Sequence, residues 1–239
     1  MSSLRQKEGL IMSINFSVLT WNVRSEKKEA ANYLSHILDW STKNYTSGKD
    51  IDFILLQETG VRDNYFQSVI GDQYQILKVL EGKTSGDNYF FAIHKAWNID
   101  DQGYVDTFDP KEAIGVRVRP AYKLCVSQGG IHLELYNFHN AFDPKGGSYA
   151  CLEMLEKQVG RINTIVAGDF NLESSAMTGL FRNFSDASNH YDHILTSLTI
   201  TYQCSIALDS DDDGLPFKDE EGDSINGSDH CAVLGCYSI

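Results

Sequence analysis

Proline is scarce in this sequence, with 4 residues among 239, and no stretch rich in proline, glycine and serine divides the chain. Hydrophobic residues make up 42% of the chain and aromatic residues 11%, which is typical of a folded globular protein with a sizeable core. This composition excludes a disordered or linker-like chain. We expect one domain over residues 14–239, preceded by an N-terminal extension, residues 1–13, that is not part of the fold.

Long apolar runs are also missing, which excludes a transmembrane helix. The first thirteen residues are polar and mixed, without the hydrophobic segment that secretory signals carry. The five cysteines are an odd number without metal-ligand spacing, so reduced thiols are favoured over disulfides. The sequence therefore predicts a cytoplasmic protein without stable membrane association, and export by a specialised route stays compatible with it.

Basic residues are fewer than acidic residues: the chain has 20 Lys and Arg against 33 Asp and Glu, which gives a formal net charge of −13. This balance argues against a protein that grips nucleic acid over a broad basic surface. It does not exclude an enzyme that brings a phosphodiester to bound cations, because metal ions reverse the local sign of charge.

Apolar residues in alternation, or in short continuous runs, predict many strands and few helices. The predicted strands are residues 16–22, 52–58, 74–80, 89–94, 103–108, 113–118, 131–138, 162–167, 193–195, 199–206 and 231–236. The predicted helices are residues 26–40, 64–70, 148–159 and 176–183. Because strands outnumber the helices between them, we expect an α/β fold in which two mixed or antiparallel β-sheets pack together, flanked by helices.

The most informative local pattern is Gly168-Asp169-Phe170-Asn171, which follows the apolar run 162–167. Because side chains alternate along an extended backbone, Asp169 and Asn171 are expected to point to the same side. A carboxylate and a carboxamide together can hold a divalent cation, orient a water molecule or steady a phosphate oxygen. The alternative is an ordinary strand-ending turn, since all three polar or small residue types favour turns.

Other predicted strands also end or begin with side chains that can bind metals or transfer protons. These are Asn22, Glu58, His139, Asp192, Asp229 and His230. Taken singly, each has an ordinary explanation as a turn residue, a solvated strand end or an interior histidine. Their joint occurrence favours convergence at one mouth of a sandwich. His230 is the natural general base, because histidine titrates near neutrality.

The same residues stand in recognisable motifs: Asn22 in TWN, Glu58 in LQE, Asp169 and Asn171 in GDFN, Asp192 in YDHI, and Asp229 and His230 in SDH. In this order, with His139 before GDFN, they resemble the endonuclease/exonuclease/phosphatase superfamily over residues 16–233. Residues 21–25 and 106–112 resemble segments of the deoxyribonuclease I group, with Lys111 where an arginine is usual. Residues 56–60, 114–118 and 146–147 resemble the deoxyribonuclease-like component of cytolethal distending toxin.

The resemblance implies a four-layer, deoxyribonuclease I-like sandwich and a phosphodiesterase that uses Mg²⁺ or Mn²⁺. The implied catalytic residues are His230 as base, Asp192 as its orienting partner, Asp169 and Asn171 around the attacked phosphate, and His139 at the leaving oxygen, with Glu81 as a candidate partner of His139. The implied metal ligands are Glu58, Asp229 and Asn22. The implied substrate contacts are Arg24, Asn171 and Lys111.

Two activities stay open within this resemblance. A DNA endonuclease, hydrolysing by attack of water activated by the His–Asp pair, is favoured by the segment around Arg24 and by His139. The alternative is a phosphatase of the same fold that acts on phosphoinositides or another phosphomonoester, an activity also attributed to the toxin component. We therefore expect DNA to be the substrate and the protein to be a monomer. An inhibitor, immunity or delivery protein is a candidate partner.

An acidic segment, residues 209–223, satisfies the D-x-[DN]-x-[DN]-G-x5-E pattern of calcium loops. The Ca²⁺ ligands would be Asp209, Asp211, Asp213 and Glu220. Against this hypothesis, the preceding segment is a predicted strand rather than a helix, and Pro216 removes a backbone N–H from the loop. A mobile acidic surface loop is the alternative, and both interpretations stay open.

Overall fold

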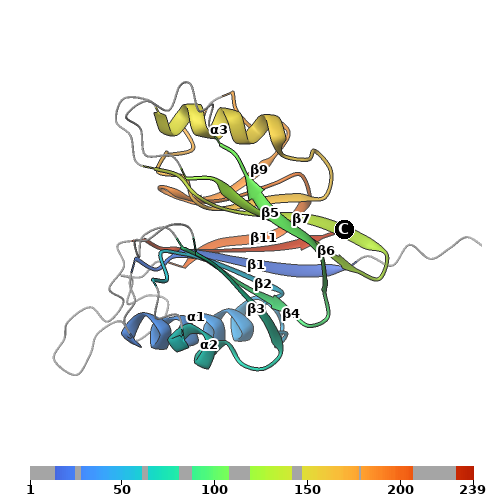
Figure 1. Cartoon of the computed structure of the whole chain (residues 1–239). Coiled ribbons are helices and arrows are strands. Elements are labelled where there is room, and N and C mark those ends of the chain that lie inside the picture. The colour runs from blue at the N-terminus through green and yellow to red at the C-terminus, as the bar shows by residue number, and fades with distance from the viewer. Residues whose placement is uncertain are drawn as a thin grey trace, which may run out of the picture.

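The computed structural model describes residues 14–24, 28–60, 64–80, 88–107, 119–141, 147–177, 179–206 and 230–239. Two six-stranded mixed sheets pack face to face, and helices cover both outer faces (Figure 1). The predicted α/β sandwich with four layers is therefore confirmed. The predictions that lie outside the described residues concern the extension 1–13, the strand 113–118, Glu81, Lys111, Asp229 and the calcium loop at 209–220.

The first sheet has the strand order β11-β12-β1-β2-β4-β3. Its strands are β1 (Asn15–Asn22), β2 (Phe53–Gln57), β3 (Tyr74–Leu80), β4 (Asn88–His94), β11 (Thr199–Ile206) and β12 (Ala232–Ser238). β1 and β2 are parallel, and the other neighbours are antiparallel. Helices α1 (Lys28–Asn44) and α2 (Asn64–Ile70) cover its outer face (Figure 1).

The second sheet has the strand order β5-β6-β7-β8-β10-β9. Its strands are β5 (Asn98–Val105), β6 (Ala121–Gln128), β7 (Ile131–His139), β8 (Thr164–Asp169), β9 (Ser185–Asn189) and β10 (Asp192–Thr196). Only β7 and β8 are parallel among the pairs of this sheet that the structure describes. Helix α3 (Gly147–Gln158) covers the outer face of this sheet (Figure 1).

Three apolar layers hold the sandwich together. Phe53, Leu135 and Ile165 belong to the layer between the two sheets and are fully buried. α1 packs on the first sheet through residues such as Leu34, and α3 packs on the second through residues such as Leu152. β2 is a continuous apolar run because both of its faces are covered. Among the described residues, no helix is long and apolar enough to span a bilayer.

Three elements differ from the prediction. In place of the predicted helix at 176–183, the described residues 176–177 and 179–183 form turns and bends, because Gly179 and Phe181 have left-handed backbones (φ +97° and +48°) that interrupt a helix. The strands β6 and β9 are not predicted. β9 consists of the turn-forming sequence SDASN, so its extended shape comes from pairing with β10 and not from local propensity.

Candidate active site

The topology brings the polar strand ends to one edge of the sandwich. Parallel pairing of β1 with β2 sets Asn22 opposite Gln57, just before Glu58, and parallel pairing of β7 with β8 sets His139 opposite Asp169. β10 is antiparallel to β8, so its first residue, Asp192, also lies opposite Asp169. Asn22 then joins the two sheets, because its Nδ2 donates a hydrogen bond to Asp169 Oδ2 at 2.9 Å.

Gly168 allows β8 to run closely beside β7 up to Asp169. Its φ is +142°, and a Cβ at this position would lie 1.9 Å from the carbonyl oxygen of Phe138. No other residue fits there without moving the β7 backbone. The glycine of the GDFN motif is thus required for packing, and it fixes the place of the aspartate that follows.

Asp169 and Asn171 lie together through a turn and not through strand alternation. Asn171 has a left-handed backbone (φ +51°), its N–H donates to Asp169 Oδ1 at 2.8 Å, and its Nδ2 donates to Asp169 Oδ2 at 3.2 Å. The geometric reason given in the prediction is therefore wrong, although the two side chains do meet. From the sequence alone, a strand-ending turn is the alternative to a binding site. In the structure that turn itself brings the side chains of Asp169 and Asn171 together.

A cavity of about 570 Å³ opens at this edge. The predicted site residues that line it are Asn22, Arg24, Glu58, His139, Asp169, Asn171, Asp192 and His230. Arg119, His190 and Tyr191 line it as well, and they are not among the predicted site residues. The structure thus brings together every predicted site residue that it describes.

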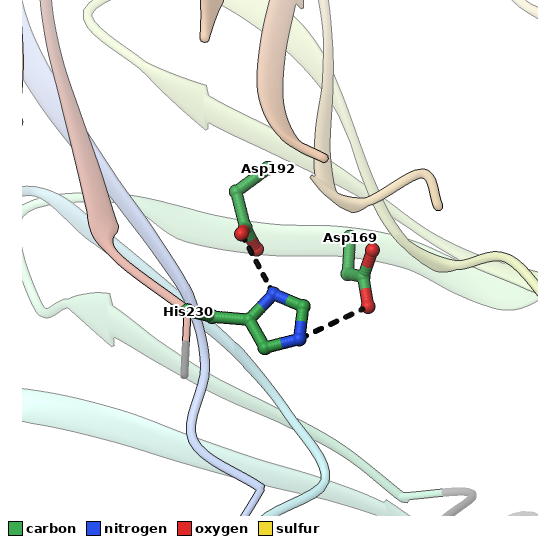
Figure 2. Close-up of side chains that lie close together, drawn as sticks. All are labelled: Asp169, Asp192 and His230. Atoms are coloured by element: carbon green, nitrogen blue, oxygen red, sulfur yellow. Dashed lines mark hydrogen bonds and ion pairs between the residues drawn. The ribbon is translucent and has the colours of Figure 1, made fainter. Parts of the chain in front are cut away.

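His230 and Asp192, which both line the cavity, form a hydrogen-bonded pair (Figure 2). His230 Nδ1 donates to Asp192 Oδ2 at 2.8 Å, and the backbone carbonyl of His230 accepts a hydrogen bond from the indole of the fully buried Trp21. The residue is therefore held through both its ring and its backbone. With Nδ1 protonated, a neutral imidazole carries its lone pair on Nε2, which lies 3.9 Å from Asp169 Oδ2.

Glu58, Asp169, His139 and Arg119 form a second cluster across the cavity. His139 is buried, and its Nε2 lies 3.2 Å from Glu58 Oε1 and 3.5 Å from Asp169 Oδ2. The guanidinium of Arg119 contacts His139 Nε2, and its Nη1 also donates to the carbonyl of Asn140 at 3.4 Å. Two carboxylates and a guanidinium thus surround one imidazole.

Four residues of the described cavity wall carry backbone strain. Arg24, Glu58, Asn171 and His190 have φ values of +44°, +55°, +51° and +50°, in a region that residues other than glycine rarely occupy. Such strain persists where surrounding contacts impose it, and it concentrates at functional sites. One such contact holds Arg24, since its N–H donates to Asn22 Oδ1 at 3.1 Å.

Among the described residues, two groups could hold a divalent cation. Asp169, Asp192 and His230 each present one ligand atom within 4.8 Å of the others (Figure 2), but Asp192 Oδ2 already accepts the His230 Nδ1–H. Glu58 and Asp169, with Asn22 between the sheets, offer oxygen ligands of the type that Mg²⁺ prefers. Burial raises the pKa of Glu58 and the charge of Asp169 raises it further, although Arg119 opposes the shift. A cation would relieve that repulsion, so the second group fits Mg²⁺ better.

Burial also dominates the ionisation of the two aspartates. It raises the pKa of Asp169 and raises the pKa of Asp192 to about 7, while His230 acts in the opposite direction on both. Within the described part of the chain, Asp192 Oδ1 has no hydrogen-bond partner, so one oxygen of this carboxylate is buried without compensation.

We expect the metal-free protein to lose stability as the pH rises. A raised pKa means that the native state keeps a proton which the unfolded state releases near pH 4. For Asp192 the resulting stabilisation is fully present below that pH and is lost as the pH rises through about 7, and the raised pKa of Asp169 acts in the same direction. A shift of one pKa unit changes the free energy of unfolding by about 1.4 kcal/mol, and a change of 1 kcal/mol shifts Tm by about 2–4 °C in a chain of this size. We therefore expect Tm in EDTA to fall by about 5 °C between about pH 5 and about pH 8. Thermal unfolding followed by circular dichroism measures this.

The control for the pH prediction is Asp192→Asn, which removes the buried aspartate whose pKa is raised to about 7. Its Tm in EDTA should depend less on pH than that of the wild-type protein. An equal slope in both proteins would show that other groups cause the pH dependence.

His193 supports the turn that carries Asp169 and Asn171. Its ring is fully buried and stacks on Phe170, with centroids 5.0 Å apart. Nδ1 lies 3.1 Å from both carboxylate oxygens of Asp186 on β9, and Nε2 lies 2.8 Å from the carbonyl oxygen of Leu172. One side chain on β10 thus ties the segment after β8 to the edge strand.

Replacing His193 with phenylalanine keeps the stacked ring but removes both polar contacts. Because a buried acceptor left without its partner costs about 1–3 kcal/mol, we expect Tm to fall by several degrees. We also expect kcat to fall while KM changes little, since the position of Asp169 loosens. His36→Phe, at an exposed site on α1, is the matched control and should leave both values unchanged. A His193→Phe protein with wild-type kcat would contradict the supporting role.

Sequence reasoning misses Arg119, His190 and Tyr191. Arg119 is nine-tenths buried and stands two residues before β6, so recognition of that strand would have identified another polar residue at a strand end. The alternation of Tyr122, Leu124 and Val126 with polar residues is the available signal. His190 and Tyr191 form the connection between β9 and β10, and the sequence of β9 gives no strand signal that would reveal a hairpin.

Comparison with known proteins agrees with this architecture. Residues 19–230 match the model of the Endonuclease/Exonuclease/phosphatase family. No curated protein sequence matches the chain.

Solved structures with a similar fold include truncated TDP2 from Caenorhabditis elegans, with a TM-score of 0.68 and 16% identity over 94% of this chain and 98% of that one. D. rerio TDP2 complexed with a single-strand DNA product has a TM-score of 0.64 and 14% identity over 93% and 98% of the two chains. An endonuclease/exonuclease/phosphatase family protein from Bacteroides thetaiotaomicron has a TM-score of 0.66 and 14% identity over 95% and 99%. At these identities the likeness shows the fold alone.

The family match begins within β1 and ends at His230. It therefore covers every strand of the second sheet and most of the first, whose strand β12 follows the match, and it includes the described cavity residues up to His230. The chain belongs to the endonuclease/exonuclease/phosphatase family, whose members are metal-dependent phosphoesterases.

Proposed function

We propose that this protein is a Mg²⁺-dependent phosphodiesterase that cuts DNA as an endonuclease. The observation that carries the proposal is the pairing of His230 Nδ1 with Asp192 at 2.8 Å, which leaves Nε2 directed at the same cavity as Asp169 and Glu58. A phosphodiester resists hydrolysis because its negative charge repels nucleophiles. Its cleavage needs a base for water, positive charge beside the phosphorus and help for the leaving oxygen.

In this proposal His230 removes a proton from water through Nε2. Asp192 fixes the tautomer and orientation of the ring and stabilises the imidazolium that forms. Asp169 and Asn171 accept hydrogen bonds from the water that attacks the phosphate. Asn171 does so through Oδ1, because its Nδ2 already donates to Asp169 Oδ2 at 3.2 Å and to the carbonyl of Asn140 at 2.7 Å.

Glu58, Asn22 and Asp169 would hold the cation, and Asp229, which the structure does not describe, is a further predicted ligand. When bound, Mg²⁺ supplies positive charge that stabilises the developing charge on the phosphoryl oxygens. Arg119 and the exposed Arg24 add guanidinium groups at the cavity, where planar donors suit phosphate oxygens. His139 contacts Arg119 and Glu58, and in this proposal it stabilises the leaving oxygen.

DNA is favoured as the substrate over a phosphomonoester by two considerations. The motif around Arg24 and the presence of His139 resemble the deoxyribonuclease I group. One structurally similar protein, D. rerio TDP2, is complexed with a single-strand DNA product. A phosphatase remains the alternative that the assay below separates.

The proposal is tested by comparing diesters with monoesters at saturating Mg²⁺. We expect nicking of supercoiled plasmid DNA and hydrolysis of methyl p-nitrophenyl phosphate, both abolished by EDTA and restored by Mg²⁺ or Mn²⁺. Release of inorganic phosphate from phosphoinositides or p-nitrophenyl phosphate should be far slower. Rapid phosphate release without nicking would replace the endonuclease with the phosphatase. No hydrolysis of either class would overturn the proposal.

A further inference from the structure

The turn between β9 and β10 brings two aromatic side chains to the cavity. Asn189 pairs with Asp192, so His190 and Tyr191 are the two residues of the hairpin connection. His190 has a left-handed backbone (φ +50°), as tight two-residue hairpin turns require. The Tyr191 carbonyl accepts the N–H of Phe170 at 2.7 Å, which ties this turn to the residue that follows Asp169.

Both rings are exposed in a protein that otherwise buries most of its aromatic residues. Tyr191 is 39% exposed, His190 is exposed, and both line the cavity. Their ring centroids lie 6.5 Å apart and the ring planes are inclined by 51°, so neither ring stacks on the face of the other. The other exposed tyrosines of the described chain, Tyr65 and Tyr104, do not line this cavity.

The position of these rings relative to the reacting groups suggests what they bind. Tyr191 directly precedes Asp192, whose carboxylate holds His230. The part of the cavity wall formed by His190 and Tyr191, which we call the rim, therefore lies next to the proposed base. A nucleobase is attached to its phosphate through a single sugar. A phosphate beside His230 therefore brings the base of the same nucleotide, or of its neighbour, to the rim.

The charge of the chain makes such a contact useful. With a formal net charge of −13, the protein lacks the broad basic surface through which many proteins bind nucleic acid. Stacking of a base on an aromatic side chain provides affinity that does not depend on charge or on base identity. An acidic enzyme that cuts with little sequence preference can hold its substrate in this way.

We propose that His190 and Tyr191 form a stacking platform for an unpaired nucleobase next to the scissile phosphate. The platform rests on the proposed function, since it assumes a nucleic-acid substrate. It requires that the base be free of its partner strand, so the bound substrate is single-stranded or locally opened at this position. Because stacking is sequence-tolerant, the platform selects nucleic acid over other phosphodiesters without selecting a base.

Equilibrium binding tests the platform separately from catalysis. The probes are fluorescein-labelled oligothymidylate and an abasic chain of the same length, titrated by anisotropy with the full-length protein and Mg²⁺ in a His230→Ala background that suppresses cleavage. We expect oligothymidylate to bind more tightly than the abasic chain. Tyr191→Ala should weaken oligothymidylate binding by about tenfold and leave the affinity for the abasic chain unchanged. Tyr191→Phe should retain the preference.

Tyr65→Ala is the matched control, because Tyr65 is 38% exposed and lies on α2, away from the cavity lining. Its affinity for both probes should equal that of the parent protein. Equal binding of the two probes by the parent protein, or an equal loss on both probes in Tyr191→Ala, would overturn the platform. A preference for oligothymidylate in a protein that hydrolyses no diester would support the platform while rejecting the proposed function.

Discussion

Replacing His230 with alanine is expected to lower kcat for phosphodiester hydrolysis by about 10³-fold, within the range that general acid–base catalysis typically contributes. His230 Nδ1 is hydrogen-bonded to a buried carboxylate and the residue lines the cavity, so its Nε2 is the base that we expect to act on a water molecule there. KM should change little, because His230 acts on the attacking water and not on the bound phosphate. The rates are measured with methyl p-nitrophenyl phosphate and with supercoiled plasmid.

Two further variants make the result specific. His36→Ala removes an exposed histidine from α1 and should keep the wild-type kcat. Asp192→Asn keeps the size of the side chain but no longer offers a carboxylate to His230 Nδ1, so we expect an intermediate loss. The dependence of kcat/KM on the protonation of a base should also disappear in His230→Ala. If that variant retained a rate within a few-fold of the wild type, the proposed mechanism would be wrong.

The positions of the cavity residues follow from simple strand geometry, which is why the sequence predicts them well. Asn22 and Glu58 lie at the ends of two parallel strands of one sheet, and His139 and Asp169 end two parallel strands of the other. Carboxyl ends of parallel neighbours share an edge, so polar residues at such ends meet once the sheets pack. Because the motifs stand at the carboxyl ends of the predicted strands, they indicate the edge of the sandwich at which the site lies, without any knowledge of side-chain contacts.

Other parts of the site depend on tertiary contacts that no local pattern contains. β9 forms from a run of serine, aspartate and asparagine because β10 supplies its pairing partner. In the sequence, His193 is one residue of a short, mainly apolar strand, and nothing nearby in the chain indicates its partners. Only the fold brings Asp186 and the Leu172 carbonyl to its two ring nitrogens. Arg119 lacks a motif of its own. Its role is visible only where its guanidinium meets His139, which lies 20 residues further along the chain at the end of β7, the strand that pairs with β6.

The wrong helix at 176–183 has the same kind of cause. Its composition is compatible with a helix, but the backbone of Phe181 is left-handed and its side chain is buried in the apolar layer that covers the second sheet. The Phe181 N–H donates to the carboxylate of Glu156 on α3 at 2.7 Å, which satisfies the backbone without a helix. Local propensity is a weak guide when a loop is held by such distant partners.

Replacing Glu58 with glutamine is expected to have opposite effects on metal binding and on stability. The substitution keeps the shape of the side chain and removes one negative charge from the pair with Asp169, which lies across the same imidazole. Mg²⁺ affinity should fall by more than the about 10- to 100-fold that is typical when a hydrogen-bond partner of a metal ligand is lost. Isothermal titration calorimetry with Mg²⁺ measures this affinity.

In EDTA at about pH 8 the same variant should be more stable than the wild type. Burial and the charge of Asp169 raise the pKa of Glu58, which means that the site without metal disfavours the ionised carboxylate, and glutamine removes that cost. Glu153→Gln, on the exposed side of α3, is the control and should change neither affinity nor Tm appreciably. A Glu58→Gln protein that binds Mg²⁺ like the wild type would exclude Glu58 as a ligand. A lower Tm in EDTA would instead show that its contacts with His139 and Arg119 outweigh the repulsion.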